Sequence, residues 1–268
     1  MTDRLPAADL RNLTTALRAE RTEMLDFTGT LSDEEWAAPS AASGWRIADV
    51  VAHIGATARN CYTPPGPDSF RATSLEQLNE GPVERRRGWN RAQVMAEYTR
   101  ATRRATTLLG VVRRTPASRL RIPLVELGRY PVGLLIGGAL VFDHHTHLRH
   151  DMAPALGRRP TPATDADRMR AVLTWMFAVL NNQIRRVPVA GLEARVALTL
   201  TGPGGGTWWL DEAGVLSPSD GPVAAHITAP ALTFPDWGTQ RSSWRDHDVT
   251  VSGDTELAAR LLDAVNVI

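Results

Sequence analysis

The spacing of apolar residues changes once along this chain, and that change limits what the chain can fold into. As far as Arg186, apolar side chains recur every three or four positions, which is typical of amphipathic helices. From Val196 to Thr201 the sequence Val-Ala-Leu-Thr-Leu-Thr alternates instead, as a half-buried strand does. The sequence therefore predicts a two-domain α plus α/β protein, with a helical first part and an α+β second part.

The helical part contains four long helical patterns. A capping-box sequence from Ser32 to Glu35 introduces the segment before the second of them. The fourth is almost wholly apolar, so we expect it at the centre of an up-down four-helix bundle formed by residues 1–160. The expected helices are 10–31, ending near Gly29, and then 47–61, 90–113 and 131–150.

The second part, residues 161–268, mixes both periods. A helix is expected over 165–186, and the two strands 196–201 and 207–210 are joined by a glycine-rich turn from Gly202 to Gly206. Further strands over 223–228 and 248–252 flank a short element at 231–237. Asp254 has the position of an N-cap for a closing helix.

Composition excludes several functions. The 30 basic residues are all arginine, so the chain has no candidate for a Walker A lysine or a Schiff-base lysine. A net charge of +1 gives no basic field of the size that nucleic acid binding requires, and we expect no nucleic-acid partner.

Cysteine usage and hydropathy indicate the compartment. Cys61 is the only cysteine, which excludes an internal disulfide and a zinc module built on cysteine pairs. The longest apolar run, 131–142, is too short to span a bilayer, and the first residues lack the pattern of a signal peptide. We expect a cytoplasmic protein with no membrane partner.

Histidines and carboxylates gather at two places in the helical part. Asp143 and His147 are one helical turn apart and could bind one ion, whereas His144 and His150 are less well placed for this. His53, on the apolar second helix, is the natural third ligand, and two histidines with one carboxylate leave coordination positions open. The alternative is a buried structural His53 and a solvated helix end.

Several segments resemble one known family, in the same order along nearly the whole chain. The segment Ser43-Gly-Trp-Arg-Ile-Ala-Asp-Val-Val-Ala-His53 is similar to a signature of the mycothiol-dependent maleylpyruvate isomerase family. The resemblance continues through Phe142–His147 and Asp151–Gly157, and then through Val196–Trp208 and Val249–Asp254. It implies a DinB-like metal-binding bundle followed by a sterol-carrier-like α+β domain.

The resemblance also implies a site and a reaction. His53, Asp143 and His147 would hold zinc or another divalent metal, although the enzyme that names the family has glutamate where this chain has Asp143. Arg241 would reach the active site as a catalytic residue, with Arg245 as a competing candidate. Mycothiol would be the thiol cosubstrate: its thiolate adds to the double bond of maleylpyruvate, the new single bond rotates, and elimination gives fumarylpyruvate.

Two alternatives stay open. The same site could serve a mycothiol S-transferase acting on another small electrophile. The chain could also be a non-enzymatic metal- or lipid-binding protein or regulator, although the ligand run of zinc anti-sigma factors is absent. Cys61 falls two turns beyond His53 in a helix interior, where we expect it to pack rather than react. The sequence leaves the oligomeric state open.

Overall fold

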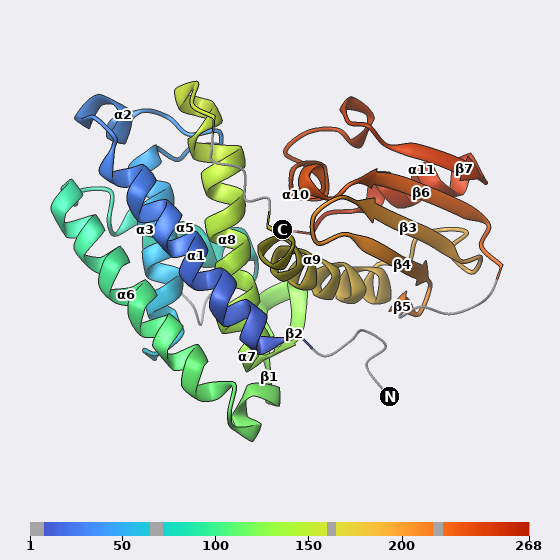
Figure 1. Cartoon of the computed structure of the whole chain (residues 1–268), viewed down its shortest axis with the longest axis horizontal. Coiled ribbons are helices and arrows are strands. Elements are labelled where there is room, and N and C mark those ends of the chain that lie inside the picture. The colour runs from blue at the N-terminus through green and yellow to red at the C-terminus, as the bar shows by residue number, and fades with distance from the viewer. Residues whose placement is uncertain (1–7, 65–71, 160–164, 217–221, 268) are drawn as a thin grey trace. The chain divides into compact units, whose positions relative to one another are not determined.

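The computed structural model describes residues 8–64, 72–159, 165–216 and 222–267 (Figure 1). It divides into a helical unit, Asp9–Pro162, and a second unit formed by Ala163–Ile268 together with Met1–Ala8. The domain boundary expected at residue 160 falls at 160–164, outside the described residues. Among the described residues, no helix is long and apolar enough to cross a membrane.

Several helices of the first unit begin at a residue whose side chain caps the helix N-terminus. Asp9 caps the first helix by accepting hydrogen bonds from the backbone N–H groups of Arg11 and Asn12. Ser32 and Glu35 form the predicted capping box of a short helix. The helices are α1 (Leu10–Gly29), α2 (Asp33–Ala37), α3 (Ile47–Asn60), α5 (Leu75–Glu84) and α6 (Arg91–Val112).

The fourth predicted helix is continuous but irregular, which corrects the regular helix expected over 131–150. It comprises α7 (Val132–Leu134), a π-helical segment η3 (Leu135–Ala139), α8 (Leu140–Thr146) and a second π-helical segment η4 (His147–Met152). Gly137 allows α1 to approach closely, because a Cβ atom there would lie 2.9 Å from the Cβ of Leu13. π-helical turns of this kind are frequent at functional sites.

One helix and one β-hairpin of the helical unit were not expected. Helix α5 begins after the N-cap Ser74 and includes Pro82, and prolines disfavour the interior of a helix. The hairpin of β1 (Arg121–Leu124) and β2 (Gly128–Pro131) contains a proline in each strand, which argues against strands on sequence grounds.

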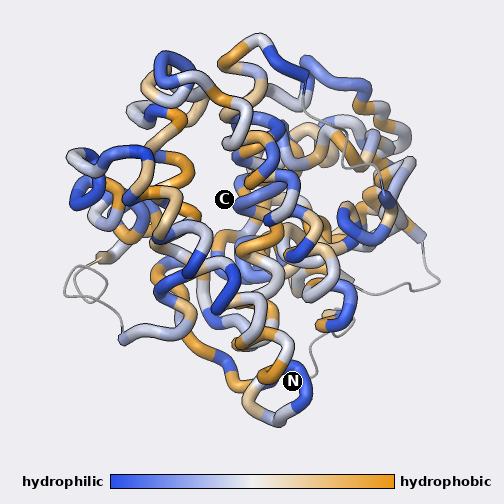
Figure 2. The backbone as a smooth tube through the Cα atoms, turned by 60° about the vertical axis from the view of Figure 1, so that its left-hand side comes forward, coloured by the Kyte–Doolittle hydropathy of each residue, from blue (hydrophilic) through white to orange (hydrophobic). Residues whose placement is uncertain are grey.

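Helix α3 is the centre of the helical unit. Its residues Ile47, Val50, Val51 and Ile54 are fully buried and belong to one apolar cluster with residues of α1, α6 and η4. The labels in Figure 1 show α1, α3, α6 and α8 lying alongside one another. Figure 2 shows hydrophobic and hydrophilic stretches alternating along the helical parts of the backbone, as is typical of amphipathic helices. This core fixes the positions of α3 and of η4, the segment that continues α8, and these helices carry the histidine and carboxylate candidates.

The second unit is α+β, as predicted. Its five strands are arranged in the order β5-β4-β3-β6-β7, with β3 and β6 parallel and the other pairs antiparallel. The strands are β3 (Val196–Thr201), β4 (Gly206–Asp211), β5 (Gly214–Leu216), β6 (Ala225–Pro230) and β7 (Thr250–Gly253), with helices α9 (Ala166–Arg186), α10 (Phe234–Trp237) and α11 (Thr255–Ala264).

The predicted hairpin between β3 and β4 is confirmed, with Gly204 at a φ of 70° in its turn. Strands β6 and β7 begin two residues later than expected, and β5 was not expected. Helix α9 packs on the sheet through Phe177, whose ring stacks on Trp208 of β4 at 3.9 Å. This contact gives Trp208 a packing role against α9.

Candidate metal centre

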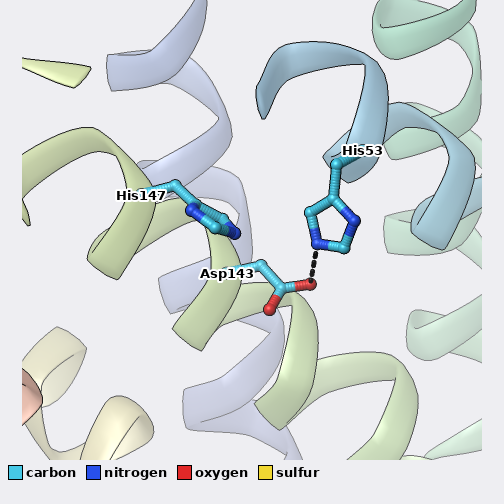
Figure 3. A group of neighbouring side chains, drawn as sticks. All are labelled: His53, Asp143 and His147. Atoms are coloured by element: carbon cyan, nitrogen blue, oxygen red, sulfur yellow. Dashed lines mark ion pairs between the residues drawn. The ribbon is translucent and has the colours of Figure 1, made fainter. Parts of the chain in front are cut away.

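Three side chains from two helices converge in the helical unit. His53 projects from α3, Asp143 projects from α8, and His147 is the residue that follows α8 (Figure 3). One ligand atom of each lies within 4.8 Å of the other two, and His53 Nε2 is 3.8 Å from Asp143 Oδ2. The structure thus brings together the three residues that were predicted from the sequence as metal ligands.

The spacing of these atoms is slightly wider than one small metal ion spans. Zinc binds imidazole nitrogen and carboxylate oxygen at about 2.0–2.2 Å, so two ligands of one ion lie at most about 4.3 Å apart. Small side-chain rotations therefore suffice to bring all three atoms onto one ion. Two histidines and one carboxylate also leave at least one coordination position for another ligand.

His53 is held as a neutral imidazole. Its side chain is buried, and burial together with the neighbouring His147 holds its pKa well below the ordinary value of 6.5. The ring packs against the indole of Trp45, with ring centroids 5.0 Å apart. A neutral imidazole has a lone pair for a metal at pH 7.

His147 is oriented by a second carboxylate. Its Nδ1 is 2.7 Å from Oδ2 of Asp151, one helical turn further on, and the Asp151 side chain is only 1% exposed. The same four-residue spacing that relates Asp143 to His147 relates His147 to Asp151. This spacing can be read from the sequence, where Asp151 otherwise stands only as the first residue of the family-like segment Asp151–Gly157.

Trp45 is a further neighbour that the sequence did not assign to the site. Its ring centroid lies 6.2 Å from that of His147 as well as 5.0 Å from that of His53. The indole Nε1–H donates a hydrogen bond to Glu80 of α5, which also pairs with Arg87. Trp45 is therefore fixed as an aromatic wall beside both histidines.

The neighbouring histidines of the same helix face elsewhere. His144 Nδ1 lies 2.6 Å from the carbonyl oxygen of Leu140, and its Nε2 lies 3.0 Å from the hydroxyl of Tyr98. His145 Nδ1 lies 3.2 Å from Glu20 Oε1. Both rings are buried, so the alternative of a solvated helix end is wrong. Neither belongs to the group of three.

The comparisons with known proteins agree with this geometry. Residues 17–149 match the family model described as mycothiol maleylpyruvate isomerase N-terminal domain. The helical unit belongs to this family. The family model thus covers both helices that carry the three converging side chains.

Solved structures extend the similarity to the second unit. The crystal structure of the mycothiol-dependent maleylpyruvate isomerase aligns with a TM-score of 0.54, and that of its histidine-to-alanine mutant with 0.56. Each is 16% identical in sequence and covers 94% of this chain and 96% of its own. This similarity shows a shared fold. A search of curated proteins found no match.

Cys61 follows the last residue of α3 as its C-cap, which corrects the helix-interior position expected for it, and its thiol is a poor nucleophile. Burial and the negative charge of Asp143 raise the pKa of the Cys61 thiol to about 12. Its Sγ lies 3.5 Å from the carbonyl oxygen of Thr57. A thiol with such a pKa is almost wholly protonated at pH 7.

The two arginines that the resemblance suggested for the active site differ in the groups that their guanidinium groups contact. Arg245 makes two hydrogen bonds to the carboxylate of Asp263 and lies over the Trp244 ring, 4.3 Å from its centroid. Arg241 is exposed, and its Nη1 donates to the hydroxyl of Thr239. Both lie in the second unit.

His247 has an acidic neighbour that its sequence context did not suggest. Its Nε2 lies 3.3 Å from Asp236 Oδ2 and 2.6 Å from the hydroxyl of Ser242. Ser242 also donates to Asp236, so the three side chains close the loop that contains Arg241. The backbone N–H of Arg241 donates to the carbonyl of Asp236, which further fixes this loop.

Proposed function

We propose that this protein is a zinc-dependent enzyme that uses mycothiol as its thiol cosubstrate, with maleylpyruvate-isomerase-like cis–trans isomerisation as its reaction. The observation that carries the proposal is the convergence of His53, Asp143 and His147 within 4.8 Å. The family of the helical unit supports the choice of thiol and reaction. An enzyme that uses a low-molecular-weight intracellular thiol would work in the cytoplasm.

The charge of the ligand set favours an anionic partner. Two neutral imidazoles and one carboxylate compensate only one of the two charges of a divalent ion. A metal bound here would lower the pKa of a thiol that occupies its open position, so that the thiol is present as thiolate at neutral pH. Trp45 would cover one side of the histidine pair with an apolar ring and so limit water there.

The isomerisation requires a nucleophile that also leaves. Mycothiol thiolate would add to one carbon of the double bond of maleylpyruvate and give a carbanion stabilised by the adjacent carbonyl. Rotation about the resulting single bond and expulsion of the thiolate would give fumarylpyruvate and return the thiol. Cys61 would take no part in this reaction, because its thiol stays protonated.

A substrate with two carboxylates needs a cationic partner, and we assign this role to Arg241 rather than Arg245. Arg245 is already paired with Asp263 through two hydrogen bonds. Arg241 comes from a loop that Asp236, Ser242 and His247 hold closed, which would present its guanidinium in a defined position.

The test is an assay of zinc-loaded protein with mycothiol and maleylpyruvate. We expect mycothiol-dependent fumarylpyruvate formation that is lost in His53→Ala, and kept in Cys61→Ser. Arg241→Ala should raise the KM for maleylpyruvate by about 10-fold or more, while Arg245→Ala changes it little.

The other outcomes separate the remaining functions. If zinc-loaded protein binds mycothiol but leaves maleylpyruvate unchanged, and instead joins mycothiol to another electrophile, the protein is a mycothiol S-transferase. If it binds neither zinc nor mycothiol after purification in the presence of metal, the enzymatic proposal is wrong, and a non-enzymatic lipid-binding or regulatory role replaces it.

A further inference from the structure

We propose that Asp151 is a positioning residue of the metal centre, which fixes the tautomer and the ring orientation of His147 before any metal binds. The inference rests on the proposed metal site but concerns a residue outside the three ligands. It begins from the 2.7 Å contact between His147 Nδ1 and Asp151 Oδ2.

The contact determines which nitrogen of His147 is available. A carboxylate oxygen accepts hydrogen bonds, so Nδ1 carries the hydrogen and donates it to Asp151. The lone pair then resides on Nε2, the nitrogen that remains for a metal. Metal-binding histidines commonly donate their other ring N–H to a carboxylate in this way, and the partner raises the basicity of the ligand.

Asp151 is itself firmly placed. Its side chain is 1% exposed, and its backbone carbonyl accepts a hydrogen bond from the N–H of Ala41, 2.9 Å away. Ala41 lies in the loop that leads into α3, the helix of His53. Asp151 therefore connects its own helix, which carries Asp143 and His147, to the segment preceding the helix that carries the third ligand.

The opposite face of the same helical turn is also anchored. Arg149 donates to Glu20 at 2.8 Å and to Glu23 at 2.6 Å, both on α1. Contacts on both faces hold the π-helical segment η4 in place. The carboxylate of Asp151 can therefore orient His147 rather than follow it.

The two histidines of the centre differ in this respect. Within the described part of the chain, His53 makes no hydrogen bond, and its ring is oriented by packing against Trp45. The side chain of His147 is 12% exposed, against 5% for that of His53, so packing alone constrains His147 less than it constrains His53. The hydrogen bond to Asp151 supplies the missing constraint.

The first test is independent of metal. Long-range ¹H–¹⁵N correlation spectra of the metal-free protein report the tautomer of each neutral histidine, and His147→Gln identifies the signals of His147. We expect wild-type His147 as the Nδ1–H tautomer, and a mixture of tautomers in Asp151→Ala. A wild-type His147 with its hydrogen on Nε2 would overturn the inference, whether or not the protein binds zinc.

The second test measures zinc affinity by competition with a chromophoric chelator. Asp151→Ala should weaken zinc binding by about 10- to 100-fold, and Asp151→Asn, whose amide oxygen still accepts a hydrogen bond, should recover part of the loss. Asp49→Ala is the matched control, because Asp49 is a buried aspartate four residues from His53 that pairs with Arg46 instead of a histidine.

The outcomes distinguish this inference from the proposed function. Unchanged zinc affinity in Asp151→Ala, with zinc bound tightly by the wild type, would overturn the positioning role and leave the metal centre intact. An equal loss in Asp49→Ala would also overturn it, since the effect would then be general destabilisation. No zinc binding by the wild type would overturn both.

Discussion

The helical segment from Asp143 to Asp151 has two faces that use the same residue types for different purposes. On one face, Asp143 and His147 are partly exposed and converge with His53 on a position that an ion can occupy. On the other face, His145 and Arg149 are buried against Glu20. We call Glu20, Glu23, His145 and Arg149 the brace. The comparison shows that the role of a histidine or carboxylate in this segment depends on which residues of other helices it contacts. The residue type alone does not decide whether it is a candidate metal ligand or part of a structural ion network.

The brace is a buried ion network, and its energetics follow from its burial. Glu20 is fully buried, and burial alone would raise the pKa of its carboxyl group. The hydrogen bond and charge of His145 and the charge of Arg149 overcome this and lower the pKa to about 2. Breaking such a network strongly destabilises the folded protein, although forming it contributes little net stability.

The largest expected effect comes from breaking the brace. Glu20→Gln leaves the buried His145 and Arg149 without the Glu20 carboxylate, with only Glu23 still paired to Arg149, and should lower the free energy of unfolding by about 3 kcal/mol. Chemical denaturation measures this, with the exposed Glu76→Gln as control, for which we expect a change below about 0.5 kcal/mol. Zinc affinity of the folded variant should stay within about threefold of wild type, because the hydrogen bond of Arg149 to Glu23 still anchors η4 to α1. Wild-type stability in Glu20→Gln would show that the brace is dispensable.

Acid should weaken the brace in a defined range. Because the pKa of Glu20 is about 2 in the folded protein and ordinarily 4.5, its stabilisation is complete above pH 4.5 and is lost as the pH falls toward 2. Integrated over that range, the loss is about 3 kcal/mol. Denaturation curves between pH 5 and pH 2 should show this slope in wild type and not in Glu20→Gln. Equal slopes would contradict the assignment of the charge to Glu20.

A smaller effect is expected from the Tyr98–His144 pair. Burial lowers the pKa of His144 to about 4, so its ring is neutral at pH 7 and its Nε2 accepts the hydrogen bond of the Tyr98 hydroxyl. Tyr98→Phe removes that donor and should cost about 1–2 kcal/mol of unfolding free energy. Zinc binding should not change, and a loss of zinc binding in this variant would mean that the two faces are coupled.

Much of this arrangement could be predicted from the sequence, because periodicity and caps are local signals. The helices that begin at Leu10, Ile47 and Arg91 lie where their apolar spacing indicated, and the switch to a period of two located the sheet. Helix α5 escaped prediction because Pro82 lies inside it, and β5 because its three residues carry almost no pattern.

The site was predictable to the extent that it follows helical spacing. Asp143 and His147 are one turn apart on one helix, and His53 lies on the apolar second helix, in a segment that is also similar to the family signature. The functions of His144 and His145 could not be read from spacing, since each depends on a residue far away in the sequence and on which face the packing turns inward. Glu20, for example, is 125 residues from His145 and carries no motif of its own.

The most direct test of the metal centre is the zinc content of purified protein by elemental analysis, after loading with zinc and removal of the excess. We expect about one zinc per chain in the wild type and in His150→Ala, whose residue lies in the same histidine run but outside the group of three. His53→Ala, Asp143→Ala and His147→Ala should each lose the metal while remaining folded. A wild-type protein without zinc, or a His53→Ala variant that keeps a full equivalent, would contradict the metal centre.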